Sequence, residues 1–411
     1  MQAPQIRRGP SPLAPLALLL ALIASTPALG FGGSPPAPDA LGPWAVGHTS
    51  FEIVDGSRDD RPLPIEAWYP ADPEDAVGEA TEYVLIPPLI VLTSTVAIEG
   101  IPVLDRRWLP LVVFSHGSGS LNIQSTELME TLASHGFVVV APSHTGNTIN
   151  DPAPDPFPII TVDRPLDVSF VIDHMLERSG DPGDPFHRRI SPFAIGVAGH
   201  SFGGYTALAM AAGFGDQVSP DPRVRAIVPT SAVTALHTDE ELASIRVPTL
   251  LIGGTLDTAV PIDPETIRAF ELVSSRHLYR ADLTGATHSH FSNVCAIADV
   301  LIGFGFTPDR WPGSVAEPLL PYYEEACTPG VFPIEESQRI QALYTVAFLR
   351  RHLYLDLRYA RFLTESYAET HEPNVIYFDA SRRDCGMGFE MVLILPPLIW
   401  FGRRTRPSAR I

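Results

Sequence analysis

One serine of this sequence, Ser201, has the surroundings of an activated nucleophile. It lies in the segment GHSFGG (residues 199–204), between an apolar strand-like run and a helix-like run. In that context a G-x-S-x-G motif is typical of a nucleophile elbow, a sharp turn that holds the serine in a strained backbone conformation with its hydroxyl exposed. Side chains at Gly199 and Gly203 would collide with neighbouring backbone, which explains the two glycines. The spacing therefore predicts covalent catalysis on a carbonyl group through Ser201.

A nucleophilic serine needs a general base, and the base needs an acid that fixes its tautomer. After a serine of this kind, the acid and then the histidine follow in the chain. The apolar run at residues 248–256 leads into Asp257, which we predict to be the acid. Asp263 and Asp282 compete with it. Asp263 stands at a predicted helix start, where an acidic side chain acts as a cap, and Asp282 lies late in the next strand-like run.

The candidate base lies in the loop LTGATHSHF (residues 283–291), which offers two histidines. His288 directly follows a turn of small residues, whereas His290 adjoins Phe291 at a predicted helix start. We expect His288 to be the base and keep His290 as the alternative, since one of the pair should have the ordinary role of a surface or capping residue.

Backbone donors for an oxyanion must be preformed, because the carbonyl oxygen gains charge in the tetrahedral intermediate. One donor is predicted to be the N–H group of Phe202, directly after the nucleophile. The other should come from the loop HGSG (residues 116–119), which follows a buried strand-like run at residues 111–115. We assign this second donor to Ser118.

Eight strand-like runs, rich in Val, Ile and aromatic residues, are separated by turn signals. From the third onward they alternate with helical patterns, which indicates βαβ units, a mostly parallel sheet with helices on both faces and a leading antiparallel pair. Together with the nucleophile-elbow motif, this order predicts the α/β-hydrolase fold, and we expect no large lid domain between Ser201 and Asp257. The segment 71–105 fits no element and is expected to be an insertion over the sheet edge. The predicted strands are residues 50–54, 63–69, 111–115, 137–141, 193–198, 224–229, 249–253 and 277–281, and the helices include 124–134, 166–178, 205–212, 264–273 and 337–355.

The composition fits one large globular domain. The chain has 411 residues, of which 45% are hydrophobic and 18% charged, enough to bury a large core. Acidic residues (47) outnumber Lys and Arg (28), the net charge is −19, and the body of the chain has no basic stripe. We therefore expect no nucleic-acid partner.

The N-terminus has the pattern of an export signal. Residues 1–30 contain two arginines, then an apolar stretch at residues 13–23, then small residues up to Gly30. The apolar stretch is too short for a membrane span. We predict an exported protein, periplasmic, at the cell surface or extracellular, whose catalytic domain covers residues 31–380.

Export brings cysteines into an oxidising compartment, where they pair. Cys295 and Cys327 both lie in the body of the chain, whereas Cys385 lies apart. We predict a disulfide between Cys295 and Cys327. In the chain-entropy model the closed loop of about 33 residues contributes roughly 3 to 4 kcal/mol of stability. Two free buried thiols are the alternative.

The C-terminal residues 385–411 are expected to be a hydrophobic sorting or anchor segment. A short motif at Cys385, an apolar run at residues 391–401 and a basic end follow one another, as in bacterial C-terminal sorting signals. The run is shorter than the ~20 residues of a full span. The basic end should stay in the cytoplasm and the catalytic domain outside. We predict membrane association, with Cys385 as a processing or lipid-attachment site; a buried final helix is the alternative.

The sequence resembles bacterial dienelactone-hydrolase-like proteins and the related platelet-activating-factor acetylhydrolases. The resemblance extends from about Val46 to about Leu355, over most of the mature chain. It implies an α/β-hydrolase that acts on esters, commonly with short or oxidised acyl groups, without metal or organic cofactor. It carries over Ser201 as the nucleophile, Asp257 as the acid and His288 as the base. The matching segments are residues 61–63, 67–70, 111–119, 133–141 and 199–204.

One departure from this family bears on the substrate. True dienelactone hydrolases use a cysteine nucleophile, while position 201 is serine, which argues against a lactone. The resemblance favours a serine esterase or lipase-like enzyme for a small-molecule or lipid ester, for example phospholipid acetyl groups or extracellular polyesters. The alternatives are an amidase or peptidase with the same triad and an inactive hydrolase fold that serves as a surface binding protein.

Overall fold

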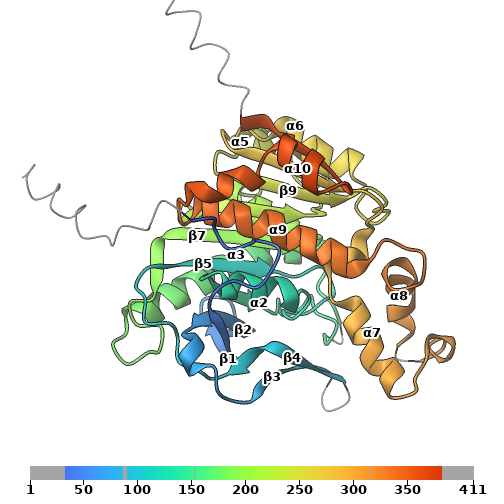
Figure 1. Cartoon of the computed structure of the whole chain (residues 1–411), viewed down its shortest axis with the longest axis horizontal. Helices are drawn as coiled ribbons and strands as arrows, with labels where there is room; N and C mark the ends of the chain where they lie inside the picture. The colour runs from blue at the N-terminus through green and yellow to red at the C-terminus, as the bar shows by residue number, and fades with distance from the viewer. Residues whose placement is uncertain (1–32, 87–89, 152, 315, 382–411) are drawn as a thin grey trace, which may run out of the picture. The chain divides into compact units, whose positions relative to one another are not determined.

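The computed structural model describes residues 33–381 except 87–89, 152 and 315 (Figure 1). All the helices and strands described below belong to one compact unit that begins at Pro36. The predicted export signal and the predicted C-terminal segment lie outside the described residues.

An eleven-stranded sheet runs through this unit, in the order β11-β10-β9-β8-β7-β5-β6-β2-β1-β4-β3. The six neighbouring strands from β10 to β6 are parallel, whereas β2 pairs antiparallel with both β6 and β1. The strands are β1 (Ala45–Asp55), β2 (Arg61–Ala71), β3 (Ala80–Ile86), β4 (Ile90–Glu99), β5 (Leu109–Ser115), β6 (Val138–Pro142), β7 (Ile190–His200), β8 (Val224–Thr230), β9 (Thr249–Gly254), β10 (Leu278–Leu283) and β11 (Val375–Asp379).

Helices cover both faces of the parallel strands, which explains why these strands are nearly continuous apolar runs. Side chains alternate between the two faces of a strand. In β5, Val112 and Phe114 belong to the core shared with α2 and α9, while Leu111 and Val113 belong to the core shared with α3 and α4. The helices are α2 (Thr126–Ser134), α3 (Phe157–Gly180), α4 (Phe202–Ala212), α5 (Asp239–Ser244), α6 (Arg268–Leu272), α7 (Val294–Gly303), α8 (Leu320–Ala326), α9 (Ile334–His352) and α10 (Glu365–His371).

All eight predicted strands are confirmed, but the predicted number is wrong, because the sheet has three more. The segment 71–105 does not cover the sheet edge; it forms β3 and β4, which extend the sheet where β4 pairs in parallel with β1. β11 adds a strand at the other edge, antiparallel to β10. Polar residues interrupt the apolar pattern of β4, and β11 has only 5 residues, so apolar runs alone do not reveal them.

Two buried histidines bear on the acid stability of this fold. His135 follows α2 and His144 follows β6, and both are at most 2% exposed. Burial is the main cause that lowers the pKa of each from 6.5 to about 4. Between these values the unfolded chain binds protons that the folded chain does not, so folding stability is lost as the pH falls from about 6.5 to about 4.

We therefore expect the melting temperature to drop over this pH range, with each histidine contributing up to about 1.4 kcal/mol per pH unit. Thermal unfolding followed by circular dichroism at a series of pH values measures the slope. His135→Gln should make it shallower, while the same change at His371, which is exposed on α10, should not. A melting temperature that stays constant from pH 6.5 to 4 would contradict the prediction.

Candidate active site

Ser201 occupies the sharp turn between β7 and α4. Its backbone has φ 58° and ψ −118°, a conformation that costs a non-glycine residue about 1 to 3 kcal/mol. The N–H group of Ser201 donates to the carbonyl oxygen of Thr230 in β8 (2.9 Å), which holds the turn. A Cβ atom at Gly203 would overlap the carbonyl oxygen of Ser115, and one at Gly199 would overlap that of Gly203. Neither position has room for a side chain.

Asp257, which follows β9, holds the imidazole of His288. Its Oδ2 lies 2.8 Å from His288 Nδ1, and its Oδ1 accepts hydrogen bonds from the N–H groups of Ala259 and Val260. Since the carboxylate accepts at Nδ1, the other ring nitrogen, Nε2, is left as a proton acceptor. His288 and Ser201 line the same cavity. Among the described residues no hydrogen bond joins them; such bonds often tighten only when substrate is bound.

The main chain of His288 is fixed from two further sides. Its N–H group donates to Oε1 of Glu325 in α8 (3.0 Å), and its carbonyl oxygen accepts from Nε2 of His200 (3.0 Å). The second oxygen of Glu325 accepts from the hydroxyl of Ser289. Three segments far apart in the sequence therefore hold one histidine.

The other candidates from the sequence are engaged elsewhere. His290 is fully buried, with Nδ1 accepting from the N–H group of Thr287 and Nε2 donating to a main-chain carbonyl, so neither nitrogen faces a substrate. Asp282 pairs with Arg280 in β10, and the exposed Asp263 begins a short helical turn. Within the described part of the chain, no group of three or more His, Cys, Asp or Glu could hold a metal ion.

In the loop after β5, the backbone N–H group of Ser118 is available as a donor. The N–H groups of Gly117, Gly119 and Ser120 all donate to oxygen atoms nearby. In the described structure the N–H group of Ser118 has no such partner. The N–H group of Phe202, the first residue of α4, has none either, as expected at a helix start. These are the two donors proposed from the sequence for the oxyanion.

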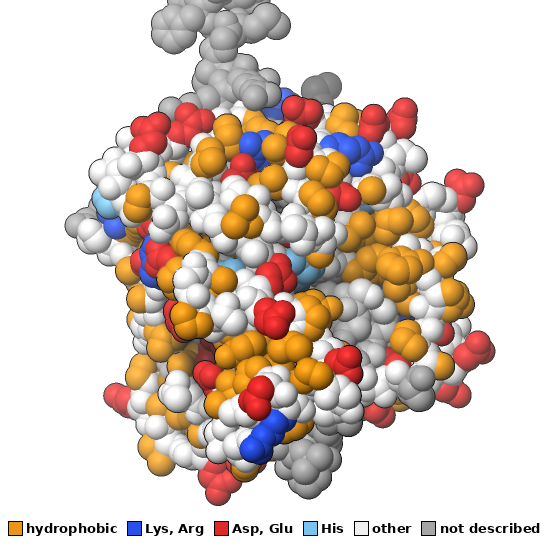
Figure 2. Space-filling model, turned by 90° about the vertical axis from the view of Figure 1, so that its right-hand side faces the viewer, with side chains coloured by type: hydrophobic (Ala, Val, Ile, Leu, Met, Phe, Trp, Pro, Cys, Tyr) orange, Lys and Arg blue, Asp and Glu red, His pale blue; other side chains and the backbone are white. Residues whose placement is uncertain are grey.

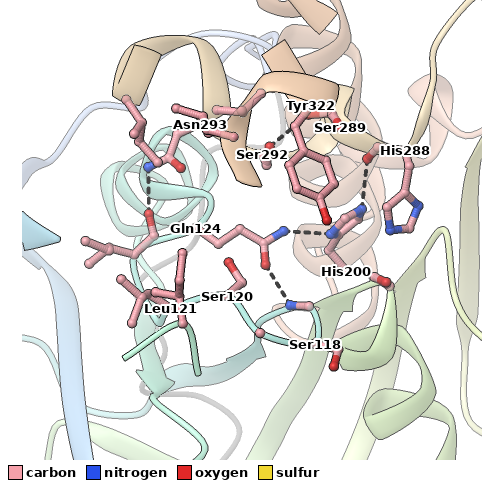
Figure 3. Close-up of a pocket in the computed structure, with 18 of the residues that line it drawn as sticks. Ser118, Ser120, Leu121, Gln124, His200, His288, Ser289, Ser292, Asn293 and Tyr322 are labelled. Atoms are coloured by element: carbon pink, nitrogen blue, oxygen red, sulfur yellow. Dashed lines mark hydrogen bonds between the residues drawn. The ribbon is translucent and has the colours of Figure 1, made fainter. Parts of the chain in front are cut away.

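Sequence reasoning missed two buried residues that connect this loop to the histidine. Gln124 accepts from the N–H group of Gly117 (2.6 Å), and its amide nitrogen lies 2.6 Å from Nδ1 of His200. Figure 3 shows the connection continuing from His200 to the carbonyl of His288. Burial, then the neighbouring His288, lower the pKa of His200 well below its ordinary value, so His200 stays neutral. The position of His200 inside the G-x-S-x-G motif was the one sign in the sequence of its role. No local sequence pattern indicates a role for Gln124.

These residues line a cavity of about 220 Å³. Serine hydroxyls, Asn293 and the groups described above supply its polar lining, and none of the described residues that line it is charged. Figure 2 shows the side of the molecule that carries α7 and α8, where hydrophobic side chains gather in patches with acidic side chains between them. The larger apolar residues that line the cavity are Leu85, Leu121, Ile123, Ile149, Val294, Ile297, Leu319 and Tyr322.

A disulfide joins the two helices that form one wall of the cavity. Cys295 in α7 is bonded to Cys327, directly after α8, with the Cα atoms 5.5 Å apart. This is the pair predicted from the sequence. Because α7 begins shortly after His288 and α8 carries Glu325, the bond keeps Glu325 beside the loop of the candidate base.

The chain is similar to known hydrolases. Residues 111–303 match the family model described as PET hydrolase-like, and residues 38–150 match that of platelet-activating factor acetylhydrolase, isoform II. The structure of a ferulic acid esterase from Streptomyces cinnamoneus aligns with a TM-score of 0.59 at 24% identity, covering 81% of this chain and 96% of that one. The chain has the α/β-hydrolase fold. The resemblance inferred from the sequence is confirmed.

Its relatives by sequence include cutinases. Cutinase 2 from Thermobifida cellulosilytica is 31% identical over 179 residues, which are 43% of this chain and 59% of that protein. A cutinase from Thermobifida fusca has the same identity over 43% of this chain and 49% of its own length. Chlorophyllase-1 from Citrus sinensis is 26% identical over 66% of this chain and 77% of its own length. The chain thus spans about half the length of the cutinases it matches.

We expect Glu325 to control the reactivity of Ser201, because it fixes the main chain of His288. Glu325→Ala should slow the labelling of Ser201 by a fluorophosphonate about tenfold, which corresponds to about 1.4 kcal/mol and to the loss of one hydrogen bond to a charged group. Reduction of the Cys295–Cys327 bond should act in the same direction. Mass spectrometry of the labelled protein gives the rate. Glu324→Ala, at the exposed neighbouring position, is the control, and equal rates for both variants would contradict the role of Glu325.

Proposed function

We propose that this α/β-hydrolase cleaves carboxylic esters through an acyl-enzyme on Ser201. The observation that carries the proposal is the contact of Asp257 with Nδ1 of His288 (2.8 Å), which leaves Nε2 as a base in the cavity that Ser201 lines. The cutinase relatives and the match to the PET hydrolase-like model support an ester as the substrate.

In the proposed reaction, His288 takes the proton of Ser201 Oγ while that oxygen attacks the carbonyl carbon. The carbonyl oxygen becomes an oxyanion that accepts hydrogen bonds from the N–H groups of Phe202 and Ser118. As the tetrahedral intermediate collapses, His288 gives its proton to the leaving oxygen, and an alcohol departs. Water, deprotonated by His288, then attacks the acyl-serine, which releases the carboxylic acid and restores Ser201. Asp257 holds the imidazolium in place in both halves.

The cavity favours compact, neutral acyl groups. Its volume of about 220 Å³ is below the ~300 to 1,000 Å³ of sites for drug-sized ligands. Its lining, which has no charged residue among those described, offers no partner to a carboxylate or a phosphate, and burying such a group without one is costly. We propose short-chain neutral esters as substrates. A phospholipid would have to keep its phosphate outside the cavity, whereas the internal repeat units of a polyester are neutral.

We also propose that the protein is exported. The Cys295–Cys327 disulfide supports this, since disulfides persist in oxidising compartments. No helix among the described residues is long and apolar enough to cross a bilayer. The signal at residues 1–30 and the membrane-associated segment at residues 385–411 lie outside the described residues and stay predictions.

Substitutions in the triad test the assigned roles. Ser201→Ala should reduce kcat for 4-nitrophenyl butyrate at least about 10³-fold, because only binding and the oxyanion donors remain. His288→Ala should be nearly as damaging. His290→Ala should instead lower the melting temperature, since it removes buried hydrogen bonds. A severe loss of kcat in folded His290→Ala, with His288→Ala active, would reverse the assignment of the base.

A substrate series tests the proposed specificity. Among 4-nitrophenyl esters, kcat/KM should be highest for acyl chains of about two to six carbons and should fall for longer chains, which exceed the cavity. The hemisuccinate should react at least about tenfold more slowly than the neutral butyrate, because its carboxylate finds no partner. Faster cleavage of the matched 4-nitroanilide would indicate an amidase. No turnover of any substrate together with no fluorophosphonate labelling would indicate an inactive binding protein.

A further inference from the structure

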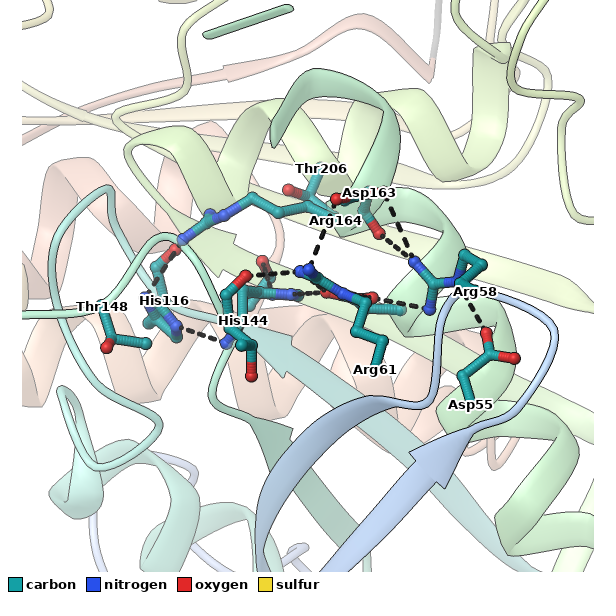
Figure 4. Close-up of polar contacts among 12 residues, drawn as sticks. Asp55, Arg58, Arg61, His116, His144, Thr148, Asp163, Arg164 and Thr206 are labelled. Atoms are coloured by element: carbon teal, nitrogen blue, oxygen red, sulfur yellow. Dashed lines mark hydrogen bonds and ion pairs between the residues drawn. The ribbon is translucent and has the colours of Figure 1, made fainter. Parts of the chain in front are cut away.

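A buried cation lies directly behind the candidate oxyanion hole. Arg164, in α3, is fully buried. Its Nη1 donates to the carbonyl oxygen of His116 (2.7 Å; Figure 4). Its Nη2 donates to the carbonyl oxygen of Gly117 (3.0 Å). The same guanidinium lies over the ring of Phe202, 5.1 Å from the ring centre. Arg164 therefore contacts both segments that supply the oxyanion donors, although it does not line the cavity itself.

The charge of Arg164 is poorly compensated. Burial lowers the pKa of Arg164 to about 9, which shows that its surroundings disfavour the charged form. Asp167, one turn along the helix, accepts its hydrogen bonds from Arg61 and His144 instead. The Nε atom of Arg164 has no hydrogen-bond partner in the described structure. A buried charge held mainly by two carbonyl oxygens contributes little to stability, so a role in the site is the better explanation for it.

The hydrogen bonds from Arg164 set the direction of the donor in the loop. The C=O and N–H groups of one trans peptide unit point in opposite directions. The carbonyl oxygen of Gly117 is held by Arg164 and by Nδ1 of His116 (2.7 Å), so the N–H group of Ser118, in the same peptide unit, points away from α3. This N–H group has no partner in the described structure, and Ser118 lines the cavity.

A second histidine supports the arrangement from behind. The N–H group of His144 donates to Nε2 of His116 (3.1 Å), which leaves the hydrogen of His116 on Nδ1, facing the carbonyl of Gly117. His144 itself lies between Ser115 and Asp167, 2.9 Å from each. These two contacts resemble those of a catalytic triad, but Ser115, His144 and Asp167 are fully buried and do not line the cavity. The cluster holds the loop and offers no second reaction site.

We propose that Arg164 is a positioning residue for the oxyanion hole, and that its charge strengthens the Ser118 donor through the Gly117–Ser118 peptide. A cation at the carbonyl end polarises the peptide and makes its N–H group a stronger donor. Negative charge develops on the substrate oxygen in the transition state, so the effect belongs to kcat and not to KM. The inference rests on the proposed ester hydrolysis.

Comparison of an ester with its thionoester tests the inference. A thionoester develops its negative charge on sulfur, a larger and weaker acceptor, so the ratio of ester to thionoester rates reports how much the oxyanion donors contribute. With 4-nitrophenyl acetate and its thionoacetate, Arg164→Gln should lower kcat for the ester about 10- to 100-fold, keep KM within about threefold and reduce the ratio about tenfold. Arg164→Lys keeps the charge but loses the planar fork, so its values should be intermediate.

Arg61→Gln is the matched control. Arg61 belongs to the same buried cluster, but it donates to Asp167 and to the carbonyl of Thr145, not to the loop. The substitution Arg61→Gln should lower the melting temperature and leave the ratio of ester to thionoester rates unchanged. A ratio in the Arg164 variants equal to that of the wild type would overturn the inference even if both rates fall, because a merely structural loss lowers both alike. If Arg164→Gln does not fold, Arg164→Lys decides by the same criterion. A wild-type protein that hydrolyses no ester would overturn the proposed function, and the inference with it.

Discussion

The backbones at the end of β5 and at the start of α4 touch at Ser115 and Gly203, with no room for a Cβ atom between them. This contact couples the strand that leads into the loop with Ser118 to the helix that begins with Phe202. Ser201 lies at the same junction, in a strained turn. Such strain persists only where the surrounding structure over-determines it, and here the hydrogen bond to Thr230 and the close contact do so. Ser201, the proposed nucleophile, and both proposed donors are thereby fixed relative to one another.

Charges in this site are placed behind the cavity and not in it. Arg164 lies behind the loop where negative charge would develop, and its hydrogen bonds reach the cavity only through a peptide unit. Asp257 and Glu325 lie behind His288, which would become positive. Because these charged groups are already in place before the reaction, they need not reorganise as charge develops on the substrate. The lining of the cavity can therefore accept a neutral substrate, while the charges behind it stabilise the charges that develop in the transition state.

Local sequence patterns were enough to predict the central strands and the turn that holds Ser201. The central strands are buried on both faces, and the elbow glycines are required by close contact, so both leave a signal in the sequence. The choice of His288 over His290 rested on turn chemistry, and the structure adds the contacts that separate them. Gln124, Arg164 and Glu325 left no such signal, and His200 left only its place inside the G-x-S-x-G motif. Their partners lie 76, 47, 37 and 88 residues away, and only the folded chain brings them together.

The wall formed by α7 and α8 follows all three residues of the proposed triad in the chain. A ribosome that has made residue 300 has already made Ser201, Asp257 and His288, but not Glu325, which fixes the main chain of His288, nor α9, which completes the core on one face of the sheet. The amino acids of the site are thus synthesised well before the contacts that arrange them can form. During synthesis, catalytic competence would be among the last properties that this domain acquires.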